Sequence, residues 1–507
     1  MIAGLGGQLV ALVFGFITRT FLVRLMSVEI LGLNGLFSNL FTILSLANLG
    51  IGTAISYSLY KPIADDDNGK VAVIRRLLNR AFITIGVLIT ALGLGLIPFL
   101  GVLVKGGDSI DGLLVIYLMY LVGYVLPYFI GYGDRAVAAA HQRDYLFSTT
   151  YTLVVVAMDL AQVVVLLSTR DYSLYVGTQV VFTLVMYLVL RVRLHRVLPH
   201  LKVTKARGGI PREERQAIMK NIRGTALYNL GFVAKNGTDS LVVSSFLGVT
   251  VLGLVSNYQY IVGAVQLVLT QALASLVASI GNLNVKENQE RKQQIFNVLL
   301  FASFWVFAFC SVCLIVLLDP FIAIWAGDKL LLPSPTTYVF MVMAMFLFGM
   351  QTAANSFRTA MGLFWYGRYR PIMSAVVNLV LAILLASIMG AAGVFLATCI
   401  SILSVDAWWD PLVVYKYGFN TSLRPYFKKY LVYVAFCVVV AAATWAIAFV
   451  VPLSGLAGLV FRLGLCLVLV NGLFWIAFRK SEEFSYLRSV VLRMLSARAK
   501  RHPESAD

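Results

Sequence analysis

Apolar stretches of about 20 residues recur from the first residue of this 507-residue chain almost to the last. A helix needs about 20 mostly apolar residues to cross the hydrocarbon core of a bilayer. Apolar residues make up 60% of the chain and charged residues 13%, whereas soluble domains average roughly 45–50% and about 25%. A soluble core does not need so much apolar surface. The sequence therefore predicts an all-α polytopic membrane protein.

About fourteen membrane-spanning helices are predicted, because that number of apolar stretches alternates with polar segments. The predicted spans are 1–26, 31–60, 81–104, 112–133, 148–168, 174–192, 223–247, 250–282, 295–318, 336–360, 371–389, 391–411, 430–451 and 455–478. The first of them lacks the basic leader and the small-residue cleavage site of a secretory signal peptide. It is therefore interpreted as a membrane helix.

The formal net charge of +18 is concentrated in alternate connecting segments. The basic segments are 61–80, 135–143, 191–223, 286–292, 368–370, 416–429 and the tail from 479. The segments between them, for example 27–30 and 248–250, are short and nearly neutral. Lys and Arg accumulate on the cytoplasmic side of membrane proteins. Both termini are therefore predicted to be cytoplasmic.

The two halves of the chain contain similar motifs at similar topological positions. Ile30-Leu31-Gly32-Leu33 opens the second predicted helix, and Val251-Leu252-Gly253-Leu254 opens the eighth. Arg135-Ala136-Val137 follows the fourth, and Arg358-Thr359-Ala360 ends the tenth. Both pairs are separated by roughly 220 residues, which indicates internal duplication of the kind found in transporters. Chance similarity between apolar sequences is the alternative interpretation.

Duplication predicts two pseudo-symmetric six-helix bundles with two further helices. The predicted organisation is an N-lobe (1–192), a basic cytoplasmic linker (193–222), a C-lobe (223–411), a pair of extra helices (412–480) and a basic cytoplasmic tail (481–507). Binding sites of repeat-built transporters lie between the repeats, so we expect the functional residues to face the space between the lobes.

Charged residues inside predicted spans are the candidate functional residues, because a charge at the bilayer centre costs about 2.5–3.5 kcal/mol on insertion scales. Arg19 and Arg24 are predicted to face a water-filled lumen, or else to snorkel to the outer interface. Lys235 and Asp239 share a helix face. They form either an ion pair that neutralises both charges, or an ion pair that breaks when cargo or a proton binds one of the two side chains. Asp159 is a candidate for ion coupling or for a structural hydrogen bond, and Asp239 is a second coupling candidate.

Basic residues at helix ends complete the candidate set. Arg358 ends the tenth span and is grouped with the lumenal cations. Arg135, Arg143 and Arg223 flank helix ends, where they form a basic cytoplasmic mouth or simply follow the positive-inside rule. The charge inside the membrane is positive or balanced. It therefore favours an anionic cargo such as a lipid diphosphate, which Arg binds through paired hydrogen bonds.

Several stretches resemble the polysaccharide transporter (oligosaccharide flippase) branch of the multidrug/oligosaccharidyl-lipid/polysaccharide (MOP) superfamily. They are 29–39 (EILGLNGLFSN), 49–54 (LGIGTA), 256–258 (SNY), 279–284 (SIGNLN) and 361–366 (MGLFWY). The resemblance implies a V-shaped cavity between the bundles, as in MATE transporters, a cationic lumen and a site in the bacterial cytoplasmic membrane. Relatives usually carry a basic stretch before the first helix, whereas this chain begins almost inside it.

The resemblance implies a flippase that moves undecaprenyl-pyrophosphate oligosaccharides to the outer leaflet during capsule or exopolysaccharide synthesis. Its expected partners are the lipid-linked oligosaccharide, the bilayer, and the polymerase and glycosyltransferases of the same pathway. A lipid II flippase is the first alternative. A drug/cation antiporter or a membrane-bound polysaccharide enzyme fits less well. The five cysteines and four histidines form no metal motif, and a Walker A sequence is missing, so no cofactor, metal or ATPase activity is predicted.

Overall fold

The computed structural model describes residues 2–44, 51–107, 110–199, 237–286, 289–363, 365–451 and 453–489. Within these ranges the chain is helical and contains no β-strand. Twelve of the described helices are long and apolar enough to cross a membrane, and many of their apolar side chains are exposed. The predicted all-α, multi-pass membrane fold is therefore confirmed. The two remaining predicted spans, 31–60 and 223–247, contain residues outside the described ranges, so the count of fourteen stays a prediction.

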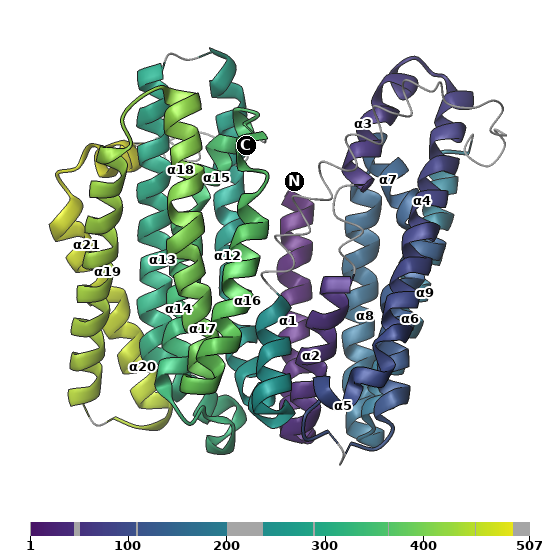
Figure 1. The fold of residues 1–507 in the computed structure, drawn as a ribbon, viewed down its shortest axis with the longest axis horizontal. Coiled ribbons are helices and arrows are strands. Elements are labelled where there is room, and N and C mark those ends of the chain that lie inside the picture. The colour runs from purple at the N-terminus through teal and green to yellow at the C-terminus, as the bar shows by residue number, and fades with distance from the viewer. Residues whose placement is uncertain are drawn as a thin grey trace, which may run out of the picture. The chain divides into compact units, whose positions relative to one another are not determined.

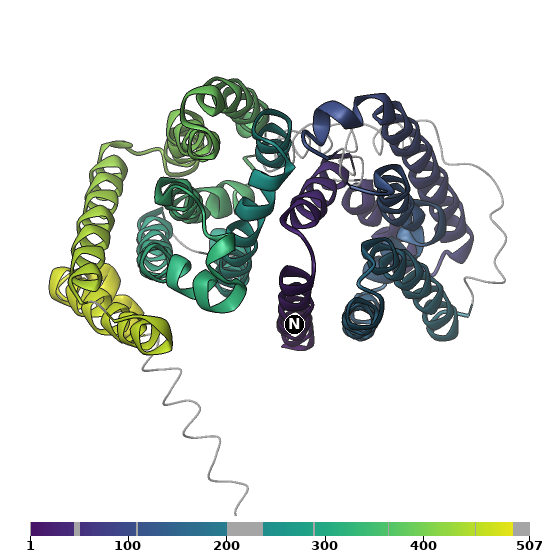
Figure 2. The same ribbon diagram turned by 90° about the horizontal axis from the view of Figure 1, so that it is seen from below.

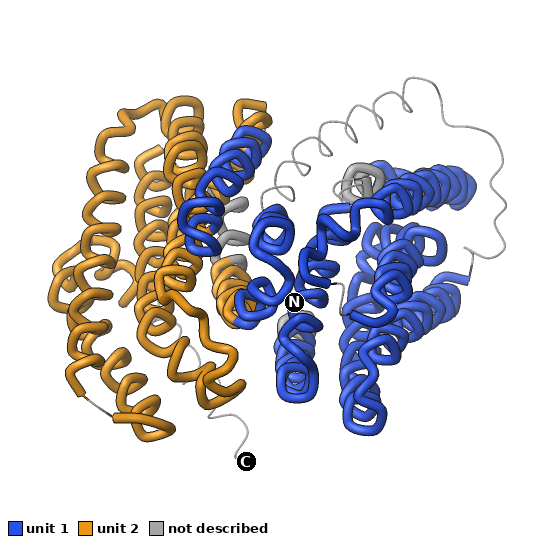
Figure 3. The backbone as a smooth tube through the Cα atoms, turned by 60° about the horizontal axis from the view of Figure 1, so that its bottom comes forward, with its two compact units in different colours: residues 1–257, 371–394 blue, residues 258–370, 395–507 orange. Residues whose placement is uncertain are grey.

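The helices group into two compact units, which Figure 3 colours separately. Unit 1 comprises residues 1–257 and 371–394, and unit 2 comprises 258–370 and 395–507. The predicted lobe boundaries at 192 and 223 fall inside unit 1 and stay predictions.

Unit 1 is built from helices that run along one another (Figure 1). Its elements are α1 (Ile2–Leu25), α2 (Val28–Leu44), α3 (Ile51–Ala64), α4 (Asn68–Gly95), η2 (Ile97–Phe99), α5 (Leu100–Leu103), α6 (Leu113–Ile130), α7 (Tyr132–Ala140), α8 (Tyr145–Thr169), α9 (Tyr172–Val197), η3 (Val243–Leu247), the start of α12 (Val249–Lys286), α16 (Arg370–Met389) from Pro371 onward, and the start of α17 (Ala391–Ser401). Helix α8 packs between α1 and α9, and α6 packs on α4 and α9.

Short capped turns connect these long helices. Between α8 and α9 the chain reverses over Arg170 and Asp171. Arg170 adopts a left-handed conformation with φ of 53°, and the Asp171 carboxylate accepts hydrogen bonds from the backbone N–H groups of Ser173 and Leu174. An aspartate at this position satisfies N–H groups that the first helical turn leaves unpaired. Two spans predicted as 148–168 and 174–192 thus form a tight hairpin.

The two motifs of the proposed duplication pack against each other inside unit 1. A Cβ atom on Gly32 of α2 would overlap the carbonyl oxygen of Val249 in α12. Reciprocally, a Cβ atom on Gly253 of α12 would overlap the carbonyl oxygen of Val28 in α2. Each glycine therefore lies under the first turn of the other helix, as expected when two copies of one motif are related by a local two-fold axis. Small residues allow such close backbone approach between membrane helices.

Unit 2 is organised around the long helix α13 (Gln289–Ala326). Its other elements are the rest of α12, η4 (Asp328–Leu330), α14 (Pro335–Met350), α15 (Thr352–Ala360), η5 (Trp365–Gly367), the rest of α17, η6 (Ile402–Asp406), α18 (Ala407–Val413), η7 (Val414–Phe419), α19 (Arg424–Val450), α20 (Gly455–Leu465), η8 (Cys466–Val470) and α21 (Asn471–Phe478). Helices α14, α15, α19 and α20 all contact α13. Figure 2 shows α19 to α21 on one side of it.

Several predicted loops are helical, which corrects their boundaries. The segment 61–80, interpreted as a basic loop, belongs mostly to α3 and α4, and only 65–67 separate the two helices. The twelfth span was expected to end at 411, before the next loop. Instead the helix continues through Pro411 to Phe419, with two π-helical segments, η6 and η7. Pro411 lies inside α18, the helix that follows η6.

We expect Gly32→Ala and Gly253→Ala to destabilise the protein, because each added methyl group would meet a backbone carbonyl that cannot rotate away. Overpacking of this kind costs about 1–3 kcal/mol. The thermal midpoint of the purified protein in detergent should fall for both variants. Gly263→Ala is the matched control, since a Cβ atom at this position of the same α12 helix meets nothing within 4 Å. Equal midpoints for all three variants would contradict the packing described above.

Candidate functional site

Arg19 lies buried in the middle of a polar cluster within unit 1. Its side chain is supplied by α1, and the residue is 7% exposed. One terminal nitrogen donates to the amide oxygen of Asn34 on α2 at 3.1 Å. The other donates to Ser256 Oγ at 2.9 Å and Asn257 Oδ1 at 2.7 Å, both on α12. Three neutral oxygens thus orient the guanidinium at a junction of three helices.

The polar cluster continues beyond Arg19 through tyrosine hydroxyl groups. Asn34 donates from Nδ2 to Tyr120 Oη at 2.9 Å, and Tyr120 and Tyr172 share a hydrogen bond of 2.9 Å between their hydroxyl groups. Tyr120 and Tyr172 are buried, on α6 and α9. The sequence interpretation missed Asn34, Asn257 and both tyrosines as site residues. Their signal was polar side chains in otherwise apolar spans, and two of them belong to the stretches that carry the family resemblance.

Asp159 is buried near the middle of α8, at 5% exposure. Thr18, next to Arg19 on α1, donates to the backbone carbonyl of Asp159 at 3.2 Å. Among the described residues, no group donates a hydrogen bond to its carboxylate Oδ2. A carboxylate in the middle of a membrane span is costly unless it binds a proton or a cation. Its geometry suits a reversible proton site, and its predicted role in coupling stays a prediction.

Asp239 lies in a second polar region of unit 1. It is 8% exposed, and its neighbour Ser240 accepts a hydrogen bond from Asn39 Nδ2 at 2.8 Å. Thr238 donates to Asn378 Oδ1 on α16 at 3.3 Å. Lys235, its predicted partner, lies outside the described residues. The predicted Lys235–Asp239 pair therefore stays a prediction.

The remaining predicted cations occupy different environments. Arg24 is exposed at the end of α1 and does not join Arg19 in the buried cluster. Arg135 is exposed, with its guanidinium carbon 3.8 Å from the centre of the Phe147 ring. Arg143 is exposed and donates to Tyr145 Oη at 3.4 Å. Arg223 lies outside the described residues, so a shared cytoplasmic mouth stays a prediction.

Arg358 is held in a buried ion network of unit 2. Its Nε lies 3.0 Å from Asp410 Oδ1, and the two side chains are 1% and 0% exposed. Asp410 Oδ2 also lies 2.8 Å from Arg370, which in turn lies 3.7 Å from Asp406. Two arginines and two aspartates balance in charge. In this conformation Arg358 is therefore neutralised by Asp410, and its predicted contact with cargo stays a prediction.

A second buried network, which the sequence did not predict, lies in unit 1. Asp134 of α7 is 3% exposed and accepts a hydrogen bond from Arg75 of α4 at 2.5 Å. Arg191 of α9 approaches the other oxygen at 3.5 Å, and His195 Nε2 lies 3.3 Å from Arg75. Arg75, Arg191 and His195 lie in the segments 61–80 and 191–223, which the sequence predicted to be basic loops. Their real role is to bind the short helix α7 to α4 and α9.

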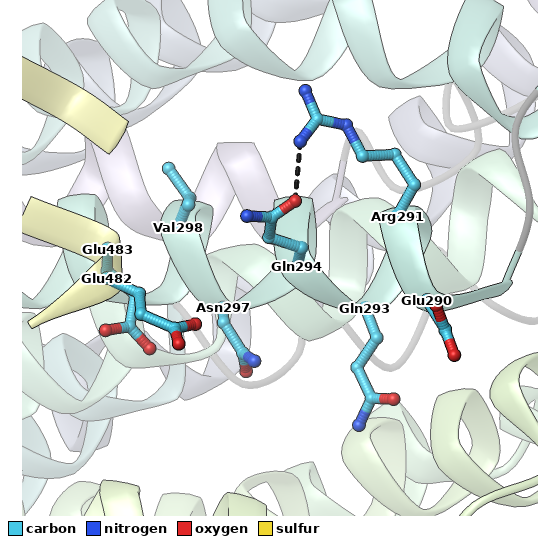
Figure 4. A pocket seen from close by; sticks show the side chains of 8 residues that line it. All are labelled: Glu290, Arg291, Gln293, Gln294, Asn297, Val298, Glu482 and Glu483. Carbon is cyan, nitrogen blue, oxygen red and sulfur yellow. Dashed lines mark hydrogen bonds between the residues drawn. The ribbon is translucent and has the colours of Figure 1, made fainter. Parts of the chain in front are cut away.

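A polar cavity of about 570 Å³ opens at the start of α13 in unit 2. Figure 4 shows Gln293 and Asn297 pointing to the same side as the carboxylates of Glu482 and Glu483. Arg291 points to the other side and donates to Gln294 at 2.5 Å. Glu483 is paired with Lys429 at 2.6 Å. None of the predicted site residues lines this cavity, so it is separate from the Arg19 cluster.

Comparison with solved structures identifies the architecture. The lipid II flippase MurJ in an inward closed conformation superposes with a TM-score of 0.70 at 12% identity, covering 94% of this chain and 99% of that one. An inward-facing multidrug resistance MATE transporter of the MOP superfamily gives 0.65 at 15% identity, covering 79% and 94%. A point mutant of the Vibrio cholerae MATE transporter VcmN gives 0.58 at 13% identity, covering 83% and 96%. This chain has the fold shared by MurJ and the MATE transporters.

Searches of protein-family models and of curated proteins found no match to the chain. Identities of 12–15% show the fold and leave the cargo open. The resemblance inferred from sequence is thus confirmed at the level of the MOP fold. Placement in the polysaccharide transporter branch stays a prediction.

We expect Asp410→Asn to destabilise the protein strongly, because it leaves Arg358 and Arg370 buried without their shared carboxylate. Breaking a buried ion pair from one side typically costs about 3–5 kcal/mol. Lys429→Gln is the control: it breaks the pair with Glu483, in which the lysine side chain is 36% exposed, and should cost about 1 kcal/mol or less. Thermal midpoints and folded yield in detergent measure the difference. Similar losses for both variants would contradict a structural role for the network.

Proposed function

We propose that this protein is a flippase for polyprenyl-pyrophosphate oligosaccharides, used in the synthesis of a cell-surface polysaccharide. The observation that carries the proposal is the Arg19 guanidinium, buried within a membrane-spanning helix and oriented by neutral oxygens of Asn34, Ser256 and Asn257. Arginine donates to phosphate through paired, charge-assisted hydrogen bonds, which are roughly twice as strong as neutral ones. A diphosphate that reaches this position would add its own negative charge to the hydrogen bonds that the guanidinium donates.

The two buried arginines differ in how readily they can bind cargo. Phosphate oxygens approaching Arg358 must displace the carboxylate of Asp410, whereas the described hydrogen-bond acceptors of Arg19 on Asn34, Ser256 and Asn257 are neutral. Arg19 is therefore the proposed first contact for the diphosphate. Arg358 contacts the diphosphate only in a conformation in which its ion pair with Asp410 is broken. Alternation of the lobes between inward- and outward-open states would then carry the head group across while the polyprenyl tail stays in lipid.

Replacing Arg19 by Gln should abolish most transport, because the neutral amide cannot replace a charge-assisted hydrogen bond worth about 1.5–3 kcal/mol. We expect at least roughly tenfold slower export of surface polymer in a strain that depends on this gene, at unchanged protein level. Arg19→Lys should restore only part of the rate, since it keeps the charge but loses the planar pair of donors. Arg170→Gln, at the exposed end of α8, is the control. Normal export by Arg19→Gln would remove this residue from the mechanism.

A lipid II flippase is the second candidate function, favoured by the superposition on MurJ, which covers 94% of this chain. Lipid II is also a polyprenyl diphosphate, so the Arg19 argument serves both cargos. The two cargos can be distinguished in a bacterial host that expresses this protein and is then depleted of its own lipid II flippase. Survival of the host would establish lipid II transport, whereas death combined with loss of surface polymer on gene deletion would support the oligosaccharide cargo.

Asp159 is the proposed proton-coupling residue, because it is buried beside the helix that carries Arg19. Asp159→Asn should keep the shape and binding of the protein while removing a group that can change charge. We expect transport into the outer leaflet of reconstituted vesicles to lose its dependence on an imposed pH gradient. Asp144→Asn, at the exposed start of the same helix, should retain it. An unchanged dependence in Asp159→Asn would assign coupling elsewhere, with Asp239 the next candidate.

A further inference from the structure

Exposed aromatic side chains gather at one end of unit 2, where the segment before α16 meets η7. Trp365 is 69% exposed, Tyr369 56%, Tyr417 46% and Tyr366 44%. With the cations Arg368 and Lys416, these four form what we call the aromatic-cationic surface. Isolated exposed rings are ordinary in a membrane protein, but a cluster of this kind marks an interaction site.

The two segments that make this surface are fixed to each other. The rings of Tyr366 and Tyr417 stack with centroids 3.9 Å apart, and Trp409 Nε1 donates to the backbone oxygen of Tyr366 at 3.0 Å. Gly367 lies directly over the buried Arg358, whose Nη1 would be 3.0 Å from a Cβ atom at that position. The surface therefore rests on the ion network of unit 2 and is preformed.

Both cations are positioned on aromatic rings at the edge of this surface. The guanidinium carbon of Arg368 lies 3.6 Å from the Trp365 ring centre and 4.5 Å from that of Tyr369. Lys416 Nζ lies 5.4 Å from the Tyr417 ring centre. Arg368 Nη1 donates to the backbone oxygen of Trp365 at 2.9 Å, and stacking on the ring leaves the other N–H groups at the rim of the guanidinium to face an anion. Aromatic rings also prefer the depth of lipid head groups.

A groove of about 330 Å³ continues from Lys416 along the end of η7. Its lining residues are Leu412, Tyr415, Lys416, Asn420, Thr421, Ser422 and Leu423. They supply one cation, an amide and three hydroxyl groups, and none of them is acidic. This composition complements a phosphate group, and the adjoining leucines and rings complement glycerol and acyl chains.

We infer that the aromatic-cationic surface and its groove bind an anionic phospholipid, with the phosphate between Arg368 and Lys416. Charge complementarity favours this occupant, because basic residues near an anionic leaflet are attracted to its head groups. A soluble anion would gain nothing from the four exposed rings. The basic segments 368–370 and 416–429 are predicted to be cytoplasmic, so the lipid would come from the inner leaflet.

Fluorescence quenching in nanodiscs tests the inference without any transport assay, so its outcome is independent of the proposed function. Brominated phosphatidylglycerol and brominated phosphatidylcholine are compared at equal mole fraction, and Trp365→Phe identifies the contribution of Trp365. We expect at least twofold stronger quenching of Trp365 by the anionic lipid. Arg368→Gln combined with Lys416→Gln should remove the preference. Lys329→Gln, an exposed lysine in η4 of the same unit, should keep it.

Equal quenching by the two lipids in the unmodified protein would overturn the inference, as would a preference that survives in the double variant. Inorganic phosphate, added at matched ionic strength, separates a lipid from a soluble anion. It should leave the preference for phosphatidylglycerol unchanged, and reversal by phosphate would assign the site to a free anion instead. Retained elution volume in size-exclusion chromatography shows that the double variant is folded.

Discussion

A charged side chain inside a bilayer is stable only where neighbouring helices supply its partners, and this constraint explains the arrangement of both units. The buried carboxylate of Asp134 binds Arg75 and Arg191, and that of Asp410 binds Arg358 and Arg370. Each network joins a short nine-residue helix to the longer helices around it. Because the unpaired charges would cost several kcal/mol each, the networks fix α7 and α15 in place.

The two networks each involve a nine-residue helix that follows a break after a long helix. Helix α7 follows α6 after Gly131, and α15 follows α14 after Gln351, as expected for two copies of one motif. In α7 the buried charge is Asp134, while the adjacent Arg135 is exposed. In α15 the buried charge is Arg358 itself. Both segments thus contain a buried ion pair near a helix break, with an aspartate on the short helix in one and an arginine in the other. This supports duplication followed by divergence.

The sequence predicted the membrane fold well, because length and apolarity of a span follow directly from bilayer thickness. It predicted that Gly32 and Gly253 occupy corresponding places in two similar motifs. It did not predict that the two glycines contact each other, because that contact depends on how the helices cross. Loop boundaries failed where basic residues lie within a helix, as Arg75 does in α4. The sequence marked Arg19 as unusual. The identity of its partners required the structure, because Asn34 and Asn257 are far apart along the chain.

The nature of those partners separates framework charges from candidate ligand-binding charges. Arg358 and Arg75 are bound by carboxylates, whose full negative charge resists exchange with an incoming anion. The described partners of Arg19 are amide and hydroxyl oxygens, which orient the guanidinium through dipoles. A phosphate oxygen would bring a formal negative charge that these described partners lack. Cargo that is released on the other side of the membrane must bind reversibly. Reversible binding is easier at a side chain whose contact with cargo does not require a buried structural ion pair to break.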